Sequence, residues 1–333
     1  TTEIYTLSLH DALPILIMDF ALQIARIPKT DGMALIEDSC WAGGGNASSA
    51  IVALARLGAR CAMVGTTGND AYGAFCRADM EKNGVDVSHV KQVEGETTLC
   101  VCLAERETQG RSFLGRAGVA GEMTAEDVDE QLIANARVVH LSCSRCTGQE
   151  AAVKFAKKHG VEVSLDAALL TPATKELADQ SDILIMSEQF YEGLFGNDEN
   201  YQENCRKLVG QGTKIAVVTL GKKGCAGADG TKIFRMEAFS EGYPIVDTTG
   251  AGDVYHGGFL YAYLYRYRRE PWNYDVEDCA RFASAVSYIN CTTLGGRPGI
   301  PNLSMVDTFL KEGVIPEGDI PRRKAMYRNG VFQ

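Results

Sequence analysis

The spacing of apolar residues along the chain alternates between two periods. Short, nearly continuous apolar runs have the length of buried strands, and the longer runs between them repeat every three to four residues, as amphipathic helices do. This alternation predicts an α/β fold in which a mostly parallel sheet is covered by helices on both faces. The expected strands cover residues 61–65, 138–141, 161–165, 183–186 and 215–219, and the expected helices cover residues 48–57, 72–82, 149–158, 254–264 and 276–289.

Two stretches break this alternation. Residues 20–25 with 33–40, and residues 97–103 with 111–116, have the pattern of strand pairs separated by turn-rich segments. We therefore expect a second, smaller sheet beside the main one. The tail over residues 313–333 is interrupted by prolines and rich in arginine, so we expect it to be a solvated C-terminal extension.

Composition narrows the class of protein. The 333 residues are 45% hydrophobic and carry a net charge of −10 without a lysine-rich block, which disfavours nucleic acid or a membrane as a partner. Eleven cysteines, an odd number without a secretory segment, indicate reduced thiols in a cytoplasmic protein. Cys143 and Cys146 have the spacing of a redox or zinc pair, but structural zinc needs four ligands and no second pair accompanies them.

One glycine-rich segment, from Asp247 to Asp253, combines an anion cradle with a carboxylate. The small residues Gly250, Ala251 and Gly252 let backbone N–H groups converge at a helix N-terminus, where they favour a phosphate charge. Asp253 in the same turn can accept the proton of a hydroxyl that attacks a γ-phosphate. The alternative is a helix start capped by threonine and loosened by glycine, since short glycine motifs arise often by chance.

A second glycine-rich helix entry lies far upstream, where Gly44, Gly45 and Asn46 open a predicted helix. Together the two motifs resemble the signatures of the PfkB family of carbohydrate kinases, whose ribokinase-like fold is a three-layer α/β/α arrangement with a small β-sheet lid. The later motif matches that family in every position, and the earlier one matches in its glycines. The resemblance implies a sugar kinase domain over residues 16–312.

The resemblance also implies roles for individual residues. Asp253 matches the family's catalytic base, and the three small residues before it match its anion hole. Asp19 resembles the acidic residue that binds sugar hydroxyls, since a carboxylate can accept two hydrogen bonds from a diol; an exposed turn residue is the alternative. The first motif would line the same pocket with Gly44, Gly45 and Asn46, where glycine permits close backbone approach.

The lid and the nucleotide site follow from the same resemblance. In the family the small sheet covers the sugar and often pairs subunits, which implies a homodimer through lid strands at about residues 20–42 and 97–117. ATP would lie beside the turn that contains Thr219, Gly221 and Gly224, although an ordinary hairpin turn has the same glycines.

Cations are implied as well. Asp247 and Thr249 would hold a monovalent cation such as K⁺, beside the segment around Gly295 that covers adenine. Mg²⁺ would accompany the ATP phosphates. Many members carry an Asn-x-x-Glu motif where this chain has Ser187 and Glu188. Either Glu188 serves Mg²⁺ through water, or Ser187 simply caps a helix.

Two arginines are candidates for recognising an anionic substrate. Arg116 ends a lid strand and Arg145 follows a central strand, where a guanidinium could grip a carboxylate, phosphate or sulfonate. A surface ion pair is the alternative for each. The residues after Asp253 and the segment 291–301 are similar to the sulfofructose kinase-like branch of the family. We assign His256 to packing or to the surface.

The first fifteen residues stand apart, because residues 1–15 resemble the in-frame translation of a short-read sequencing adapter. We expect this segment to be a non-native artefact and exclude it from fold reasoning, as a tag would be excluded. The apolar stretch over residues 12–18 has no basic flank and is too short to span a bilayer. The family's first strand is then missing or only mimicked here.

The sequence therefore predicts an ATP-dependent kinase that phosphorylates a hydroxyl of a sugar or sugar acid. A nucleoside kinase of the same fold would need aromatic lid residues to stack a base, and the lid offers only Phe20, Trp41 and Phe113. A sugar-binding regulatory protein without turnover is the third possibility. The altered magnesium motif permits it, whereas the intact Asp253 motif speaks against it.

Overall fold

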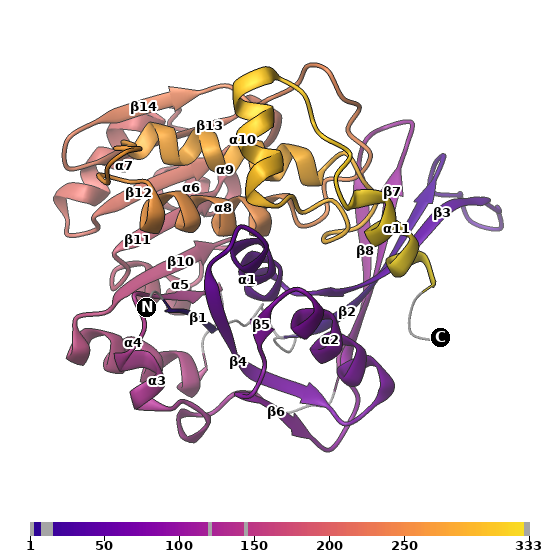
Figure 1. The fold of residues 1–333 in the computed structure, drawn as a ribbon, viewed down its shortest axis with the longest axis horizontal. Helices are drawn as coiled ribbons and strands as arrows, with labels where there is room; N and C mark the ends of the chain where they lie inside the picture. The colour runs from indigo at the N-terminus through magenta and orange to yellow at the C-terminus, as the bar shows by residue number, and fades with distance from the viewer. Residues whose placement is uncertain (1–2, 8–15, 119–121, 143–145, 330–333) are drawn as a thin grey trace.

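The computed structural model describes residues 3–7, 16–118, 122–142 and 146–329, whose strands form two sheets (Figure 1). The large sheet is the centre of the molecule, and the small one projects from its side. The strands of the large sheet are β1 (Glu3–Leu7), β4 (Arg60–Gly68), β5 (Val85–Asp86), β6 (Val90–Val93), β9 (Val138–Leu141), β10 (Glu162–Ala167), β11 (Ile183–Ser187), β12 (Ile215–Thr219), β13 (Cys225–Asp229) and β14 (Ile233–Met236).

The large sheet has the order β14-β13-β12-β11-β10-β9-β1-β4-β5, with β6 paired to β4. Neighbouring strands are parallel except at one edge, where β13 is antiparallel to both β12 and β14. This confirms the mostly parallel sheet expected from the apolar runs. Strand β1 pairs with both β4 and β9, so residues 3–7 of the segment resembling an adapter occupy the place of the family's first strand.

Helices cover both faces of the large sheet, which explains why strands such as β9 and β12 are apolar along nearly their whole length. The chain moves outward from β1 in both directions, and right-handed crossovers then put α1 and α2 on one face and α4 to α7 on the other. The helices are α1 (Asn46–Arg56), α2 (Ala71–Lys82), α3 (Glu130–Ala134), α4 (Thr147–His159), α5 (Pro172–Ala178), α6 (Glu188–Phe195), α7 (Tyr201–Gly210), α8 (Ala251–Tyr265), α9 (Val276–Asn290), α10 (Leu303–Glu312) and α11 (Ile320–Asn329), with 3-10 turns at Ala125–Asp127 and Gly221–Lys223.

Helix α8, which follows the later glycine motif, is held between α1 and α9. A Cβ added to Gly257 would collide with the carbonyl oxygen of Ala50 in α1, and one added to Gly258 would lie 2.9 Å from Cα of Ala283 in α9. These glycines let the three helix backbones approach closely, so the start of α8 has a defined position over the sheet.

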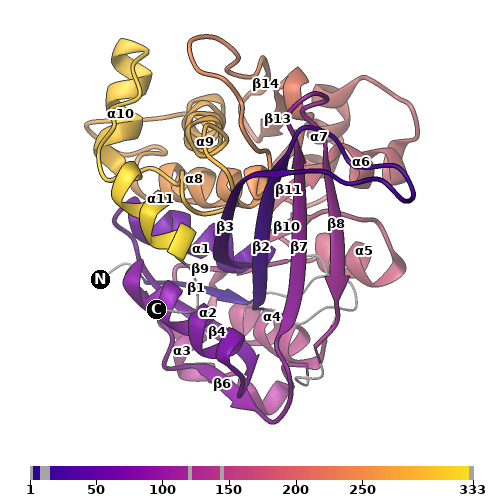
Figure 2. The same cartoon turned by 90° about the vertical axis from the view of Figure 1, so that its right-hand side faces the viewer.

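The small sheet, which we call the lid sheet, has the order β3-β2-β7-β8 and stands beside α11 in Figure 2. The two strand pairs predicted from the sequence are confirmed. Strand β3 extends to the first glycine motif, so that motif lies where the lid meets α1. The strands are β2 (Ile17–Ile24), β3 (Ile36–Gly44), β7 (Thr98–Glu105) and β8 (Arg111–Arg116).

The expectation of a solvated tail is wrong for residues 320–328. Helix α11 packs against β3, and Tyr327 is only 1% exposed. Arg323 is also buried, and its Nη1 donates a hydrogen bond of 2.6 Å to the carbonyl oxygen of Ile300. The prolines and arginines suggested a solvated segment, but its long side chains reach polar partners inside the domain. None of the helices described here is both long and apolar enough to cross a lipid bilayer.

Candidate active site

Polar side chains gather at the carboxyl ends of the parallel strands. Asp166 lies near the end of β10, Ser187 and Thr219 end β11 and β12, and the start of α8 and one face of the lid sheet lie nearby. Ligands of open parallel α/β sheets bind at this edge, next to the point where the strand order reverses. The fold therefore brings together segments that are far apart along the chain.

The start of α8 presents the backbone amides of the later glycine motif, of which that of Ala251 donates to the carbonyl of Thr248 at 3.2 Å. Gly250 is its N-cap residue and has a left-handed conformation with φ of 72°. The carbonyl of Gly250 accepts the first helical bond, at 2.9 Å from the amide of Val254. A Cβ placed on Gly252 would meet no atom within 4 Å, so the side of the turn at Gly252 is not covered by other described residues. Half-buried Asp253 lies in the same turn, which places a carboxylate beside the amides.

Asp247 ties this cradle to the segment after α9. Its two oxygens accept hydrogen bonds from the amides of Thr249 and Gly295, each at 2.8 Å. A Cβ on Gly250 would lie 3.0 Å from Cα of Gly296, so the two loops are in close contact. The buried Oγ1 of Thr249 has no hydrogen-bond partner among the residues described.

Asp19 lies on the lid face that is turned toward α8. Its carboxylate rests directly against Gly44, where an added Cβ would collide with both oxygens. Burial raises the pKa of Asp19 well above its usual value, and repulsion from Cys100, Asp253 and Asp247 raises the pKa further, although Arg297 opposes it. Asp19 and Asp253 therefore share one electrostatic environment. Hydroxyl donors from a ligand would stabilise the Asp19 anion.

Asn46, at the start of α1, is connected to α8 through Asp166. Nδ2 of Asn46 donates to one oxygen of Asp166 at 3.3 Å, and Nε2 of His256 lies 3.2 Å from the other. His256 is buried and acts in packing, as one of our two interpretations had it. Its neighbour His140 is also buried, which lowers the pKa of His140 to about 3 and keeps that ring neutral. Sequence reasoning missed Asp166, although it follows a predicted strand.

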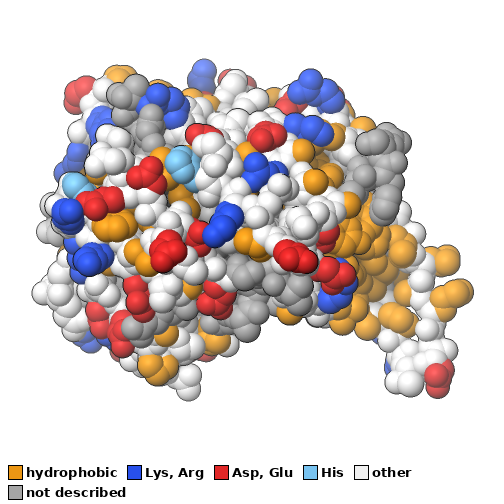
Figure 3. Space-filling model, turned by 90° about the horizontal axis from the view of Figure 1, so that it is seen from below, with side chains coloured by type: hydrophobic (Ala, Val, Ile, Leu, Met, Phe, Trp, Pro, Cys, Tyr) orange, Lys and Arg blue, Asp and Glu red, His pale blue; other side chains and the backbone are white. Residues whose placement is uncertain are grey.

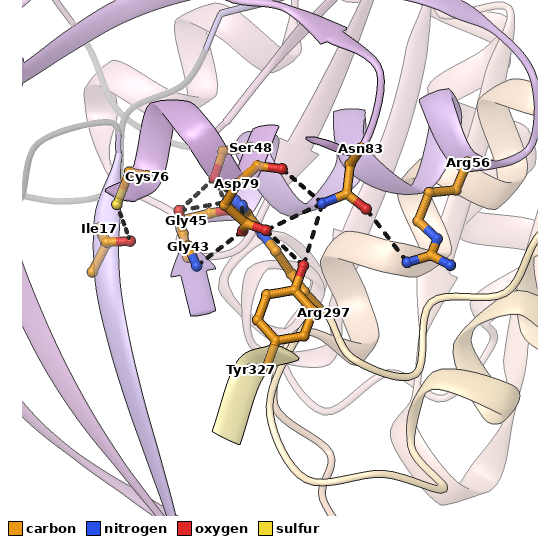
Figure 4. Close-up of polar contacts among 11 residues, drawn as sticks. Ile17, Gly43, Gly45, Ser48, Arg56, Cys76, Asp79, Asn83, Arg297 and Tyr327 are labelled. Carbon is orange, nitrogen blue, oxygen red and sulfur yellow. Dashed lines mark hydrogen bonds and ion pairs between the residues drawn. The ribbon is translucent and has the colours of Figure 1, made fainter. Parts of the chain in front are cut away.

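A buried ion pair that the sequence did not reveal supports the first glycine motif (Figure 4). Nη1 of Arg297 lies 2.6 Å from Oδ2 of Asp79, and neither side chain is more than 1% exposed. Nη2 of Arg297 donates to Oγ of Ser48 at 2.6 Å, and Oδ2 of Asp79 accepts from the amide of Gly43 at 3.1 Å. Tyr327 of α11 donates to the other Asp79 oxygen at 2.6 Å. The C-terminal segments thus hold the loop on which Gly44 and Gly45 stand.

The structure does not bring Arg116 to this site. Strand register puts Asp19, Cys100 and Gly115 on one face of the lid sheet, so Arg116 points to the opposite face. There it forms a 2.8 Å ion pair with Glu96, and both side chains are at least half exposed. Arg116 therefore forms a surface ion pair, which was the alternative to substrate binding. Arg145, and Cys143 of the predicted cysteine pair, lie outside the described residues.

A different lid arginine faces the site. Arg111 shares the face of Asp19, and its Nη1 donates to the carbonyl oxygen of Thr248 and lies 3.2 Å from that residue's hydroxyl. Its guanidinium is 5.6 Å from the ring centre of Phe113 on the same strand face. Arg111 is thus the positive charge that the lid presents to the motif.

The predicted nucleotide turn closes tightly after β12. The amide of Leu220 donates to the carbonyl of Gly224 at 2.8 Å. Gly221 and Gly224 have positive φ, and a Cβ on Gly224 would collide with the carbonyl of Met236. Both glycines are therefore required by the turn itself. Thr219, at the end of β12, donates from its hydroxyl to the carbonyl of Met186 at 3.2 Å.

Of the two interpretations of the altered magnesium motif, the helix cap is present in the structure. Oγ of Ser187 accepts from the amide of Phe190 at 3.0 Å and so caps α6. Glu188 forms a 2.9 Å ion pair with Lys223 of the glycine turn after β12. Its carboxylate lies beside the turn, but a lysine already neutralises it.

Comparisons with known proteins agree with this geometry. A curated relative, the ATP-dependent ribose-1-phosphate kinase of Halopiger xanaduensis, is 29% identical over 300 residues, which cover 88% of this chain and 95% of that protein. A fructokinase of Solanum tuberosum is 28% identical over 309 residues, which cover 90% and 96%. The ribokinase of Arabidopsis thaliana, solved with ribose and ATP, has a TM-score of 0.74 and 25% identity, covering 93% of this chain and 98% of its own.

The family model described as pfkB family carbohydrate kinase matches residues 16–303. The match begins directly after the segment that resembles an adapter and includes both glycine motifs, the lid sheet and the loops around Asp247 and Arg297. Because it spans most of the chain, this protein belongs to the pfkB family of carbohydrate kinases and is a phosphotransferase.

Proposed function

We propose that this enzyme transfers the γ-phosphoryl group of ATP to a hydroxyl of a sugar or sugar acid that lies between Asp19 and Asp253. The observation that carries the proposal is that two carboxylates near the site have different surroundings. Asp19 rests against Gly44 on the lid, whereas Asp253 lies in the first turn of α8 beside the amide cradle. One can orient the sugar while the other takes a proton.

In this proposal Asp253 is the general base. It accepts the proton of the attacking hydroxyl, and the amides at Gly250, Ala251 and Gly252 stabilise the negative charge on the transferring phosphoryl group. The N-terminal end of α8 adds its dipole to the same field. Lid closure would exclude water, which otherwise competes for the phosphoryl group.

The lid aromatics favour a sugar over a nucleoside as the acceptor. Phe20 and Trp41 stack on each other with ring centres 3.9 Å apart, but strand register puts both on the face opposite Asp19. On the Asp19 face only Phe113 is available among the three aromatics that the lid offered. Relatives named for ribose 1-phosphate and fructose are consistent with a small sugar acceptor.

Arg111 is our candidate for contact with an anionic group, in place of Arg116. It is exposed, faces the motif and lies against Thr248. A guanidinium at this position could bind a phosphate of ATP or an anionic substituent of the sugar. Relatives named for ribose 1-phosphate and for fructose are both similar to this chain, so the assay compares phosphorylated with neutral sugars.

The oxygen atoms around Asp247 fit a monovalent cation. Each oxygen of Asp247 accepts one amide, which leaves lone pairs, and the buried Thr249 hydroxyl has no hydrogen-bond partner among the residues described. We propose that these two residues hold K⁺ beside the loop of Gly295. Mg²⁺ would bind mainly to the ATP phosphates, and Glu188 would reach it through water only by leaving Lys223.

The outer face of the lid sheet is our candidate for a homodimer contact. Figure 3 shows hydrophobic side chains gathered over this part of the molecule. Leu114 is 62% exposed there, in the same cross-strand row as Val101 and the half-buried Phe20 and Trp41. Exposed apolar surface of this kind favours burial against a partner. Light scattering should give twice the chain mass, and Leu114→Lys should shift it toward the monomer.

The kinase proposal is tested by sugar-dependent ADP release across neutral, acidic and phosphorylated sugars, in a chain whose residues 1–15 have been replaced by a native N-terminus. Asp253→Asn should lower kcat by a factor of about 10² to 10⁴, the usual contribution of a general base, while sugar binding persists. Asp179→Asn, an exposed carboxylate that pairs with Lys175, is the matched control. Full activity of Asp253→Asn would refute the assignment.

A further inference from the structure

Two cysteines accompany Asp19 on the site face of the lid sheet. Cys100 is its registered neighbour on β7, and Cys102 follows two residues later on the same face. The two sulfur atoms are 3.7 Å apart. One ligand atom from each of the three residues lies within 4.8 Å of the other two. The phosphoryl-transfer proposal gives the thiols no role.

The spacing of the two sulfur atoms fits a tetrahedral metal ion, and the Asp19 carboxylate lies within 4.8 Å of both. Two Zn–S bonds of about 2.3 Å at a tetrahedral angle hold the sulfur atoms about 3.8 Å apart, which is close to the observed separation. A carboxylate oxygen is an accepted third ligand, and thiolates select soft or borderline ions over Mg²⁺. Cys102 is buried, whereas Cys100 and Asp19 are partly exposed, so an ion could enter and keep a water as its fourth ligand.

We propose that Asp19, Cys100 and Cys102 bind one Zn²⁺ ion on the site face of the lid sheet. The divalent charge offsets the repulsion that would arise from a carboxylate and two thiolates held so close together. The strands preform the arrangement, because register fixes all three side chains on one face. Little ordering of the chain is then required on binding.

Zn²⁺ occupancy has a consequence for catalysis, and this consequence rests on the proposed function. Asp19 cannot accept sugar hydroxyls while it ligates a metal, so Zn²⁺ should raise the apparent KM for the sugar and leave kcat unchanged at saturating sugar. Trace Zn²⁺ would then prevent the sugar from binding at Asp19, and a chelator would restore sugar binding.

The test uses the full chain with Co²⁺ as a spectroscopic probe, in the absence of ATP and sugar. Thiols are first counted in the unfolded protein, so that an oxidised pair is not mistaken for an empty site. Titration with Co²⁺ should produce a thiolate-to-metal charge-transfer band and the intense visible bands of a tetrahedral ion. Both should saturate at one equivalent and disappear when Zn²⁺ is added.

Variants assign the bands to these residues. Cys100→Ser and Cys102→Ser should each abolish the charge-transfer intensity of one sulfur, and Asp19→Asn should weaken binding at least tenfold. Cys205→Ala, which alters a buried thiol outside the lid sheet, is the matched control and should bind as the wild type does. Bands that are absent from the reduced wild type, or unchanged in both serine variants, would overturn the metal site. Since no sugar is present, either failure leaves the kinase proposal intact.

Discussion

Loss of the Arg297 guanidinium should weaken the loop that carries Gly44 and Gly45, on which sugar binding depends, without affecting the transfer step itself. Arg297 and Asp79 are both fully buried and form a 2.6 Å ion pair. Burial lowers the pKa of Arg297, but the attraction of Asp79 outweighs it and the net pKa is raised, so Arg297 stays charged at neutral pH. Arg297→Met leaves Asp79 as a buried carboxylate without its cation.

Loss of one partner of a buried ion pair costs about 3 to 5 kcal/mol. We expect the lower end, about 3 kcal/mol, because Asp79 keeps hydrogen bonds from Tyr327 and from the amide of Gly43. With an unfolding entropy of roughly 0.7 kcal/mol/K for a chain of this length, the thermal midpoint should fall by about 4 °C. Arg116→Met, which breaks an exposed pair, should change stability by less than about 1 kcal/mol.

The kinetic effect should appear in KM. The same guanidinium bonds Ser48 and approaches the carbonyl of Gly44 at 3.4 Å, so its loss loosens the loop on which Asp19 rests. We expect the KM for the sugar to rise roughly tenfold, the equivalent of one hydrogen bond of about 1.4 kcal/mol. Arg297→Lys should recover most of the stability, because its ammonium group can pair with Asp79. The KM for the sugar should stay close to that of Arg297→Met, because lysine cannot also replace the hydrogen bond to Ser48.

Denaturant unfolding and ADP-release kinetics on the wild type, the three single variants and one double variant provide the comparison. The double variant Asp79→Asn with Arg297→Met should be more stable than Arg297→Met alone, because no unpaired charge is left in the interior. The reasoning is refuted if Arg297→Met unfolds within 1 kcal/mol of the wild type. It is also refuted if kcat falls while KM stays constant.

Two further predictions concern the sugar pocket. Gly44→Ala should raise the KM for the sugar severalfold, because its Cβ would displace the Asp19 carboxylate, whereas Gly210→Ala, whose Cβ meets no atom within 4 Å, should leave KM unchanged; equal KM values would contradict the placement of Asp19. Burial raises the pKa of Asp19 in the folded chain above the unfolded value near 4, so the folded state holds that proton more tightly. The free energy of unfolding of the wild type should therefore fall relative to Asp19→Asn as the pH rises from about 4 through the raised pKa, and stay level below pH 4. Urea denaturation at several pH values measures this, and a constant difference would show that Asp19 is not desolvated.

Much of the fold could be predicted because its signals are local. Apolar runs marked the strands β4, β9, β10, β11 and β12 of the large sheet, and strand pairs separated by turn-rich segments marked the lid strands. The strands β5, β6, β13 and β14 and the helices α3, α5, α7 and α10 were not anticipated, and α6 was anticipated only as the alternative in which Ser187 caps a helix. Helix α11 was misjudged, because the burial of Tyr327 depends on the distant carboxylate of Asp79. A tail's own residues do not show which partner it will meet.

Some features of the site follow from the local sequence, and others depend on the tertiary structure. The sequence by itself determined the amide cradle at Gly250 to Gly252 with Asp253 in its first turn, because the conformational freedom of glycine and the geometry of a helix start are local properties. It also determined that Arg111 and Arg116, five residues apart, point to opposite faces of a strand. Only the tertiary structure decided which of them faces the site, since that depends on the register of β8 with β7 and of β7 with β2. The pairing of Arg297 with Asp79 was likewise decided in three dimensions, because a buried charge takes whichever partner the fold brings within reach.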